Sequence, residues 1–283
     1  MKVVYSPSCL SYNYPGHPES PQRIERIYLS LKTMPSISFI QPQKAAKQDI
    51  LSVHNQTLVA AVKNGTYTDA DTPVIPGIYK ISLLAAGAAI EASHIVQREG
   101  SSYALVRPPG HHATKRNIGG FCYFNNIAIA VKKLLKNKKR VAILDIDVHH
   151  GNGTQDIFLG EKNVLFCSLH QVPLYPGTGW KSQDNCHNFP LPPRTEGNRY
   201  VEVLNNALKV IKNYSPDILA VSLGFDTYED DLLAQIKLKK NDYQKIGALI
   251  STFKLPTFFV QEGGYSQDIG ILAQQFFSGF LRL

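Results

Sequence analysis

The sequence lacks the long apolar run that a membrane-spanning helix needs. Its most apolar stretch, near Ile81–Ile90, is interrupted by Ser82 and Gly87 and falls short of the roughly 20 residues of a span. The first nine residues, MKVVYSPSC, contain one lysine and a short apolar segment, without the longer apolar region of a secretory signal. We therefore expect a cytoplasmic protein that binds no membrane, and export by a specialised system stays open.

Paired cysteines are also absent. The four cysteines are scattered and form no C-x-x-C motif, so they predict no disulfide framework and suit a reducing compartment. The chain has too little charge (18%) and too many aromatic residues (10%) to be disordered. Its 283 residues contain no internal repeat and no polar linker, which predicts a single domain over residues 1–283.

A strong charge excess of one sign is missing as well, because the formal net charge is only +8. The basic residues are densest in Lys132–Arg140 and Lys237–Lys240. We interpret both stretches as solvated, with steering of an acidic partner as the alternative. No aromatic residue lies among these charges, so we expect no direct binding of nucleic acid.

What the sequence does contain is a regular alternation of strand and helix patterns. The predicted strands are Val3–Tyr5, Tyr103–Arg107, Arg140–Asp147, Asn163–Leu169, Asp217–Gly224 and Pro256–Gln261. The predicted helices are Pro21–Lys32, Gln56–Lys63, Ile78–Gln97, Asn125–Lys136, Arg199–Lys212, Asp242–Phe253 and Asp268–Leu281. Several strands are continuous apolar runs, which favours burial on both faces. The pattern predicts an α/β fold with a mostly parallel sheet flanked by helices, and an irregular stretch over residues 171–198.

Histidine and aspartate gather where these strands end. The motifs PPGHHA, DIDVHHGNG and EGGY follow three of the strands, and His170 and Asp226 follow two others. Because ligands of parallel sheets bind at the carboxyl ends of the strands, we expect one functional site there.

The segment DIDVHH predicts a metal site. Asp145, Asp147 and His149 alternate along an extended chain, so their side chains share one face, and Asp226 can supply a further ligand. Two carboxylates and one imidazole leave an open coordination position, which is typical of a catalytic site. Ligands without sulfur suit Zn²⁺, Fe²⁺, Mn²⁺ or Co²⁺. The alternative is that the aspartates cap helices and the histidine is a buried hydrogen-bonding residue.

His111 and His112 follow a stiff Pro-Pro-Gly turn and can act as general base and acid beside such a metal. Asp145 and Asn152 are the candidates for orienting them. Tyr265, after two glycines, can donate a hydrogen bond to a developing oxyanion.

These motifs resemble a known family. RPPGHHA (107–113), GGFCYFNN (119–126), LDIDVHHGNGTQ (144–155), SLH (168–170), PGTG (176–179), GFD (224–226) and EGGY (262–265) occur in this order. The chain is similar to metal-dependent histone deacetylase-like proteins, particularly the class II branch. That superfamily also includes acetylpolyamine amidohydrolases and acetoin-utilisation proteins. The resemblance implies a three-layer arginase/deacetylase-like fold.

The resemblance also implies roles for individual residues. Asp147, His149 and Asp226 would bind Zn²⁺, with Fe²⁺ or Co²⁺ possible. His112 would be the main general base and acid, His111 its electrostatic partner on Asp145, and Tyr265 the oxyanion stabiliser. The other implied sites are structural potassium (Asp145, Ser168, Leu169), the substrate channel (Gly120, Phe121, Tyr175, Leu233) and acetate release (Arg23).

Two departures from the family pattern bear on activity and substrate. Asn152 replaces an aspartate of class I members and would make His112 a weaker base. Leu233 stands where some polyamine-specific members carry a glutamate, so it offers no anion to a cationic polyamine.

We therefore expect zinc-dependent hydrolysis of N6-acetyl- or acyl-lysine in peptides or proteins, releasing acetate and free lysine. The alternative is an amidohydrolase of small acetylated amines such as acetylpolyamines. A non-catalytic acyl-lysine-binding protein and an arginase-like dinuclear manganese enzyme are further alternatives.

Overall fold

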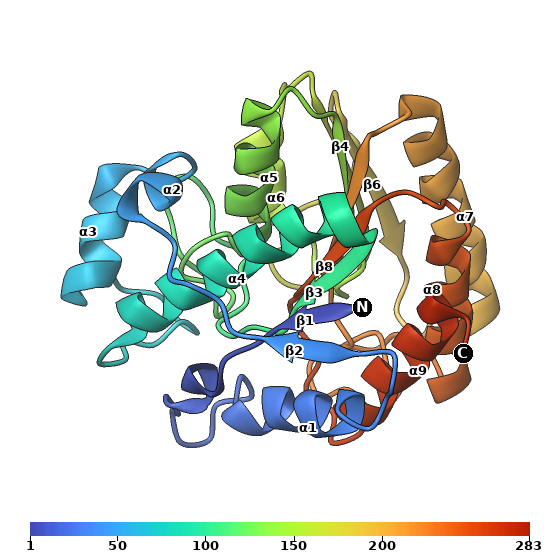
Figure 1. Ribbon diagram of the computed structural model, residues 1–283, viewed down its shortest axis with the longest axis horizontal. Helices are drawn as coiled ribbons and strands as arrows, with labels where there is room; N and C mark the ends of the chain where they lie inside the picture. Colours follow the sequence, from blue (N-terminus) through green and yellow to red (C-terminus); the bar gives the residue numbers. More distant parts are fainter.

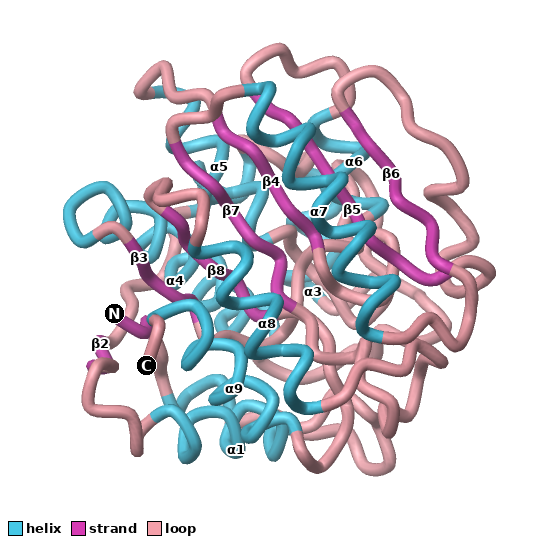
Figure 2. The backbone as a smooth tube through the Cα atoms, turned by 90° about the vertical axis from the view of Figure 1, so that its right-hand side faces the viewer, coloured by secondary structure: helices cyan, strands magenta, loops and turns pink.

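Eight strands form one sheet in which every neighbouring pair is parallel, in the order β2-β1-β3-β8-β7-β4-β5-β6. The computed structural model describes residues 1–283. The strands are β1 (Lys2–Val4), β2 (Ser38–Ile40), β3 (Ser101–Ala104), β4 (Val141–Asp145), β5 (Val164–Gln171), β6 (Cys186–Leu191), β7 (Ile218–Leu223) and β8 (Thr257–Gln261). Figure 2 shows β3, β8, β7, β4, β5 and β6 side by side.

Helices cover both faces of this sheet (Figure 1). One face packs against α2 (Lys47–Leu51), α3 (Gln56–Asn64), α4 (Ile78–Glu99), α5 (Asn126–Lys136) and α6 (Asn152–Phe158). The other packs against α1 (Pro21–Leu31), α7 (Gly197–Tyr214), α8 (Lys240–Ser251) and α9 (Ile269–Leu281). A short 3-10 helix, η1 (Pro7–Leu10), follows β1.

The helices on both faces of the sheet explain the continuous apolar runs of its strands. Along β4, Val141 and Ile143 belong to the core on one face, and Ala142 and Leu144 belong to the core on the other. Because both faces exclude water, neither set can be polar. The three-layer α/β fold expected from the sequence is confirmed, and the sheet is wholly rather than mostly parallel.

Every predicted helix and strand is present, but some boundaries were wrong. The strand predicted over Tyr103–Arg107 is β3 and ends at Ala104. Arg107 leaves the sheet because its buried guanidinium donates hydrogen bonds to Glu19. The strand predicted over Arg140–Asp147 likewise ends at Asp145, where its pairing with β5 and β7 stops.

The prediction that residues 171–198 are irregular was partly wrong. This stretch contains β6, which pairs with β5 from Phe166↔Cys186 onward. Strand β6 lies at the sheet edge, where Pro190 and polar side chains are tolerated, so it lacks the apolar signature of a central strand. The elements β2, α2 and α6 were not predicted either.

The strand order brings the chemically interesting residues together. The five strands β3, β8, β7, β4 and β5 are consecutive neighbours, so the motifs that follow them meet at one edge of the sheet. No helix in the structure combines the length and apolar character that crossing a membrane requires.

Candidate metal-dependent active site

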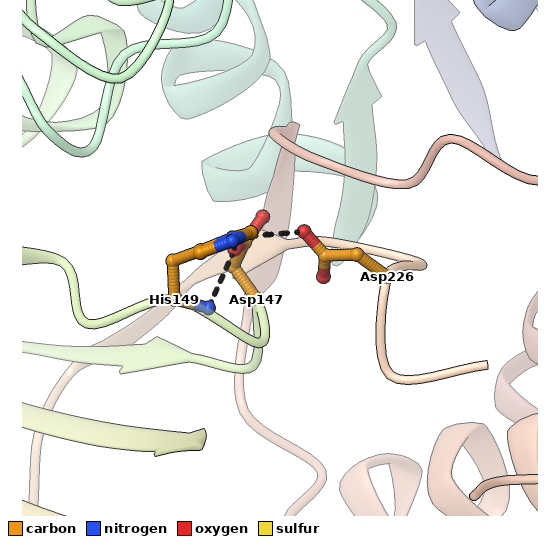
Figure 3. Close-up of side chains that lie close together, drawn as sticks. All are labelled: Asp147, His149 and Asp226. Atoms are coloured by element: carbon orange, nitrogen blue, oxygen red, sulfur yellow. Dashed lines mark hydrogen bonds and ion pairs between the residues drawn. The ribbon is translucent and has the colours of Figure 1, made fainter. Parts of the chain in front are cut away.

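Asp147, His149 and Asp226 form a buried group of potential metal ligands (Figure 3). The first two follow β4, and Asp226 follows the neighbouring strand β7. One donor atom of each lies within 4.8 Å of the others. The Nδ1 atom of His149 is 3.0 Å from Asp147 Oδ1 and 3.3 Å from Asp226 Oδ2.

The surroundings of these ligands fit a divalent cation. The Gly263 N–H donates to Asp147 Oδ2 (2.7 Å), and the Val148 N–H donates to Asp226 Oδ1 (2.8 Å). Asp226 Oδ2 is buried and accepts no hydrogen bond. Burial and the charge of Asp147 raise the pKa of Asp226, because two adjacent buried carboxylates resist joint ionisation. A metal ion with oxygen and nitrogen ligands would satisfy both the unpaired oxygen and the negative charge.

His111 and His112 lie beside this group, and their rings are 4.0 Å apart. Burial alone would lower the pKa of His111, but the charges of Asp145 and Asp147 outweigh it and raise that pKa to about 10. The Nδ1 atom of His111 is 3.0 Å from Asp145 Oδ2. The two carboxylates therefore favour the protonated form of His111.

His112 has the opposite tendency. Its Nδ1 atom is 2.7 Å from Asn152 Oδ1, an amide oxygen that accepts a proton but supplies no charge. Burial and the neighbouring charges of His111 and His149 hold the pKa of His112 well below its usual range. With Nδ1–H donating to Asn152, the Nε2 atom of neutral His112 is left free to accept a proton.

Tyr265 is placed by a glycine turn and by Arg23. Gly264 has φ +112°, a conformation that side chains larger than hydrogen rarely adopt. Buried Arg23 donates to the Gly264 and Glu262 carbonyl oxygens, and its guanidinium lies 4.6 Å from the Tyr265 ring centre. The residue predicted to handle acetate thus lies next to Tyr265 at the inner side of the site, and that role stays a prediction.

The three residues of the predicted potassium site also lie together. Asp145 and Ser168 are paired across β4 and β5, and Leu169 is the next residue along β5. Ser168 Oγ is 2.9 Å from His170 Nδ1.

A cavity of about 210 Å³ leads to the potential metal ligand His149. All four predicted channel residues line it: Gly120, Phe121, Tyr175 and Leu233. His111, His112, His149 and Tyr265 also face the cavity. The Tyr175 ring lies 5.0 Å from His112, and the Phe121 ring lies 5.9 Å from Tyr265. The structure therefore joins the channel and the potential metal site in one pocket.

One carboxylate that lines this cavity, Asp71, and its neighbour Asp69 were not predicted from the sequence. Asp71 lines the cavity, and its Oδ1 accepts a hydrogen bond from the Gly120 N–H (3.1 Å). Asp69 Oδ1 accepts from the Asp71 N–H (3.2 Å). Burial and the nearby Asp69 raise the pKa of Asp71, and neither carboxylate forms an ion pair. The D-x-D spacing in the loop TDADTP is the signal that could have revealed them.

The loop that carries Tyr175 is held by two further histidines. His150 Nδ1 is 2.8 Å from Thr178 Oγ1, and His170 Nε2 donates to the Gly179 carbonyl oxygen (3.0 Å). Their rings are 4.6 Å apart and both are buried. The second histidine of the HH pair at 149–150 therefore supports the channel wall, while the first joins the potential metal ligands.

Comparisons with known proteins agree with this geometry. A family model described as histone deacetylase domain matches residues 17–277. A probable deacetylase of Methanothermobacter thermautotrophicus is 39% identical over 95% of this chain and 86% of its own length. Acetylpolyamine amidohydrolase 1 of Pseudomonas aeruginosa is 40% identical over 75% of this chain and 65% of its own length. The crystal structure of an acetylpolyamine aminohydrolase from Burkholderia pseudomallei matches with a TM-score of 0.93 and 28% identity, covering 99% of this chain and 98% of the other.

Proposed function

We propose that this chain, which belongs to the histone deacetylase family, is a metal-dependent amidohydrolase that removes acetyl groups from small cationic amines. The family makes it a hydrolase of acetylated amides. Among the substrates weighed from the sequence, peptide acyl-lysine was favoured and acetylated amines were the alternative. The relatives support the alternative better, since several are named acetylpolyamine amidohydrolases.

The observation that carries this choice is the carboxylate pair at the cavity. Asp71 lines the cavity, and Asp69 accepts a hydrogen bond from the backbone N–H of Asp71. No basic side chain forms an ion pair with either carboxylate. A substrate with an acetyl amide at one end and an ammonium group at the other would satisfy both ends of the site. Leu233 offers no anion at the position of the family's glutamate, and Asp69 and Asp71 would take over that task from another loop.

Asp147, His149 and Asp226 would hold the metal ion, proposed as Zn²⁺ with Fe²⁺ or Co²⁺ as alternatives. When bound, this ion would polarise the acetyl carbonyl and lower the pKa of a water molecule. A structural potassium ion would lie at Asp145, Ser168 and Leu169.

The remaining steps belong to the side chains of this chain. His112 takes a proton at Nε2 as water attacks the acetyl carbonyl carbon, while Asn152 holds its Nδ1–H. Tyr265 donates a hydrogen bond to the carbonyl oxygen as negative charge develops on it. His111, whose Nδ1 contacts Asp145, would act as the electrostatic partner of this step. The proton on His112 then passes to the leaving amine nitrogen, and Arg23, next to Tyr265, would offer a cation to the released acetate.

A competition assay tests the proposal. Purified protein supplied with zinc and potassium receives an acetyl-lysine peptide and N-acetylputrescine together, and mass spectrometry follows both. Faster loss of acetate from N-acetylputrescine is expected. A third substrate, N-pentylacetamide, replaces the ammonium by a methyl group and isolates its contribution. Equal turnover of the charged and neutral amides would contradict the role of the carboxylate pair.

Peptide acetyl-lysine remains the second candidate, because apolar side chains are exposed near the channel. Leu232, next to the channel residue Leu233, is 73% exposed, and Tyr175 is 43% exposed. Such side chains can contact a peptide chain outside the cavity. Faster deacetylation of the peptide in the same assay would establish this candidate instead.

A further inference from the structure

We propose that Asp231 is a positioning residue for the deacetylation reaction, and that its carboxylate aims the Tyr265 hydroxyl into the channel. The inference rests on the proposed function and adds a residue that the sequence motifs do not include. Asp231 lies in the loop after β7, five residues beyond Asp226.

The carboxylate of Asp231 joins two segments that are distant in the sequence. Its Oδ2 accepts a hydrogen bond from the Tyr265 N–H (2.7 Å), and its Oδ1 accepts one from the Leu233 N–H (2.9 Å). Tyr265 and Leu233 both line the cavity. One side chain therefore fixes the distance between the oxyanion donor and a wall of the channel.

Two other hydrogen bonds also hold the Tyr265 turn, and one of them acts on the same peptide unit as Asp231. Asp147 accepts from the Gly263 N–H, and Arg23 donates to the Gly264 carbonyl oxygen. The Gly264 carbonyl oxygen and the Tyr265 N–H belong to one peptide unit, so Arg23 holds one side of this plane and Asp231 holds the other. The direction of the Cα–Cβ bond, and with it the place of the hydroxyl, depends on that plane.

The chemistry of the contact requires a carboxylate. Asp231 forms no ion pair, and burial raises the pKa of its carboxyl to about 6. Keeping a charge there without a cation costs free energy, and the two backbone N–H donors offset part of this cost. An asparagine offers one oxygen acceptor and one N–H donor, so it can satisfy only one of the two backbone N–H groups.

The test compares Asp231→Asn with Asp230→Asn, a change of the same kind at the exposed neighbouring position. With N-acetylputrescine as substrate, D231N is expected to lower kcat about tenfold or more and to change KM much less, because it misplaces a group that acts in the transition state. D230N is expected to leave both values unchanged. Should D231N fail to fold, Asp231→Glu keeps both acceptor oxygens and is expected to lose part of the activity.

A double-mutant cycle with Tyr265→Phe separates positioning from general destabilisation. If Asp231 acts through the Tyr265 hydroxyl, D231N adds less than about twofold to the loss already caused by Y265F. If D231N lowered kcat by the same factor in the wild-type protein and in Y265F, the inference would be overturned. An unchanged kcat in the D231N single variant would overturn it as well.

A measurement without turnover makes the outcome independent of the substrate assignment. 3-Fluorotyrosine introduced at position 265 reports the ring environment by ¹⁹F NMR. D231N is expected to shift or broaden this resonance, and D230N is expected to leave it in place. If the wild-type protein hydrolyses no acetylated amine, the proposed function fails, and an unshifted resonance in D231N overturns the positioning role separately.

Discussion

Two adjacent imidazoles in this site have opposite protonation preferences because their partners differ. His111 lies against the carboxylate of Asp145, and His112 lies against the amide of Asn152. The charge of the first histidine further disfavours protonation of the second. This asymmetry suits the proposed roles of an electrostatic partner and a proton acceptor, and it depends on the difference between one aspartate and one asparagine.

Replacing Tyr265 by phenylalanine tests the oxyanion donor. The variant retains the ring packing on Phe121 and Arg23 but lacks the hydroxyl, so kcat should fall by roughly 10²-fold or more while KM changes little. Steady-state kinetics with N-acetylputrescine measures both values. Tyr214→Phe, at the far end of α7, is the matched control and should keep full activity. A Y265F enzyme with unchanged kcat would remove Tyr265 from the mechanism.

At the same scale, the sequence was most informative where residues that bind or react recur in short motifs. Asp147, His149 and Asp226 were predicted to meet, and the structure brings them together. Asp71 and Asp231 were not predicted, because distant backbone N–H groups are what place them at the site. Asp69 was missed with them, since its contact with the site runs through Asp71. Such contacts depend on the tertiary arrangement of loops, which a local pattern does not contain.

At the scale of elements, burial decided which strands could be predicted. The central strands β4, β7 and β8 are buried throughout and mostly apolar, and the sequence indicated all three. The edge strands β2 and β6 are short or partly polar, because one side of each has no strand neighbour to exclude water. Helix α6 was missed because it is only seven residues long and begins inside the HHGNG motif.

The packing of α8 on α9 should be highly sensitive to a single methyl group. A Cβ at Gly279 of α9 would lie 1.9 Å from the Gln244 carbonyl oxygen of α8, and the contact atom is backbone that cannot turn aside. Gly279→Ala should therefore lower the free energy of unfolding by about 2–3 kcal/mol. Chemical denaturation measures the change, with Ser278→Ala as the neighbouring control. A loss below 0.5 kcal/mol would show that the two helices separate at little cost.

His54 should make the attachment of the α2–α3 segment sensitive to acid. Its Nδ1–H donates to the Thr114 carbonyl oxygen (2.8 Å), and its Nε2 accepts from the Asn125 N–H (2.9 Å). Burial lowers the pKa of His54 from 6.5 to about 4. Above pH 6.5 the histidine is neutral in both the folded and unfolded states and contributes no pH dependence. Between pH 6.5 and 4 only the unfolded chain takes up the proton. The free energy of unfolding therefore decreases as the pH is lowered through this range, by about 3 kcal/mol in total.

Comparing unfolding free energies across this pH range isolates the contribution of His54. His54→Gln should be less stable than wild type at pH 7 but should lose less on acidification. The exposed His94→Gln serves as control and should keep the wild-type slope. Parallel slopes for wild type and H54Q would contradict the prediction.

At the scale of the whole molecule, the net charge is positive, but acidic residues are concentrated at the candidate site. The chain carries a formal charge of +8, yet seven of its 22 acidic residues lie at or beside the candidate site: Asp69, Asp71, Asp145, Asp147, Asp226, Asp231 and Glu262. Most of these carboxylates are buried, where water screens them poorly. The field at the cavity is therefore set locally, and it suits a metal cation inside and the cationic substrate proposed above.

The same concentration of charge predicts that metal binding stabilises the fold. Asp147, His149 and Asp226 come from the ends of the two adjacent central strands β4 and β7, so an ion held among them joins these strands and relieves the repulsion between two buried carboxylates. Binding a hundredfold above its dissociation constant would stabilise the fold by about 2.7 kcal/mol, which raises the melting temperature of a chain this long by about 5 °C. Removing the metal with a chelator should lower the melting temperature and abolish turnover, and one equivalent of Zn²⁺ should restore both.

Asp226→Ala provides the matched comparison for this experiment. Without one ligand the variant should contain no stoichiometric metal, and a chelator should leave its melting temperature unchanged. Metal analysis of wild type and variant decides the ligand assignment: one ion per chain retained in D226A would contradict it. Two ions per wild-type chain would instead favour the dinuclear manganese alternative, which needs more bridging carboxylates than the three ligands supply.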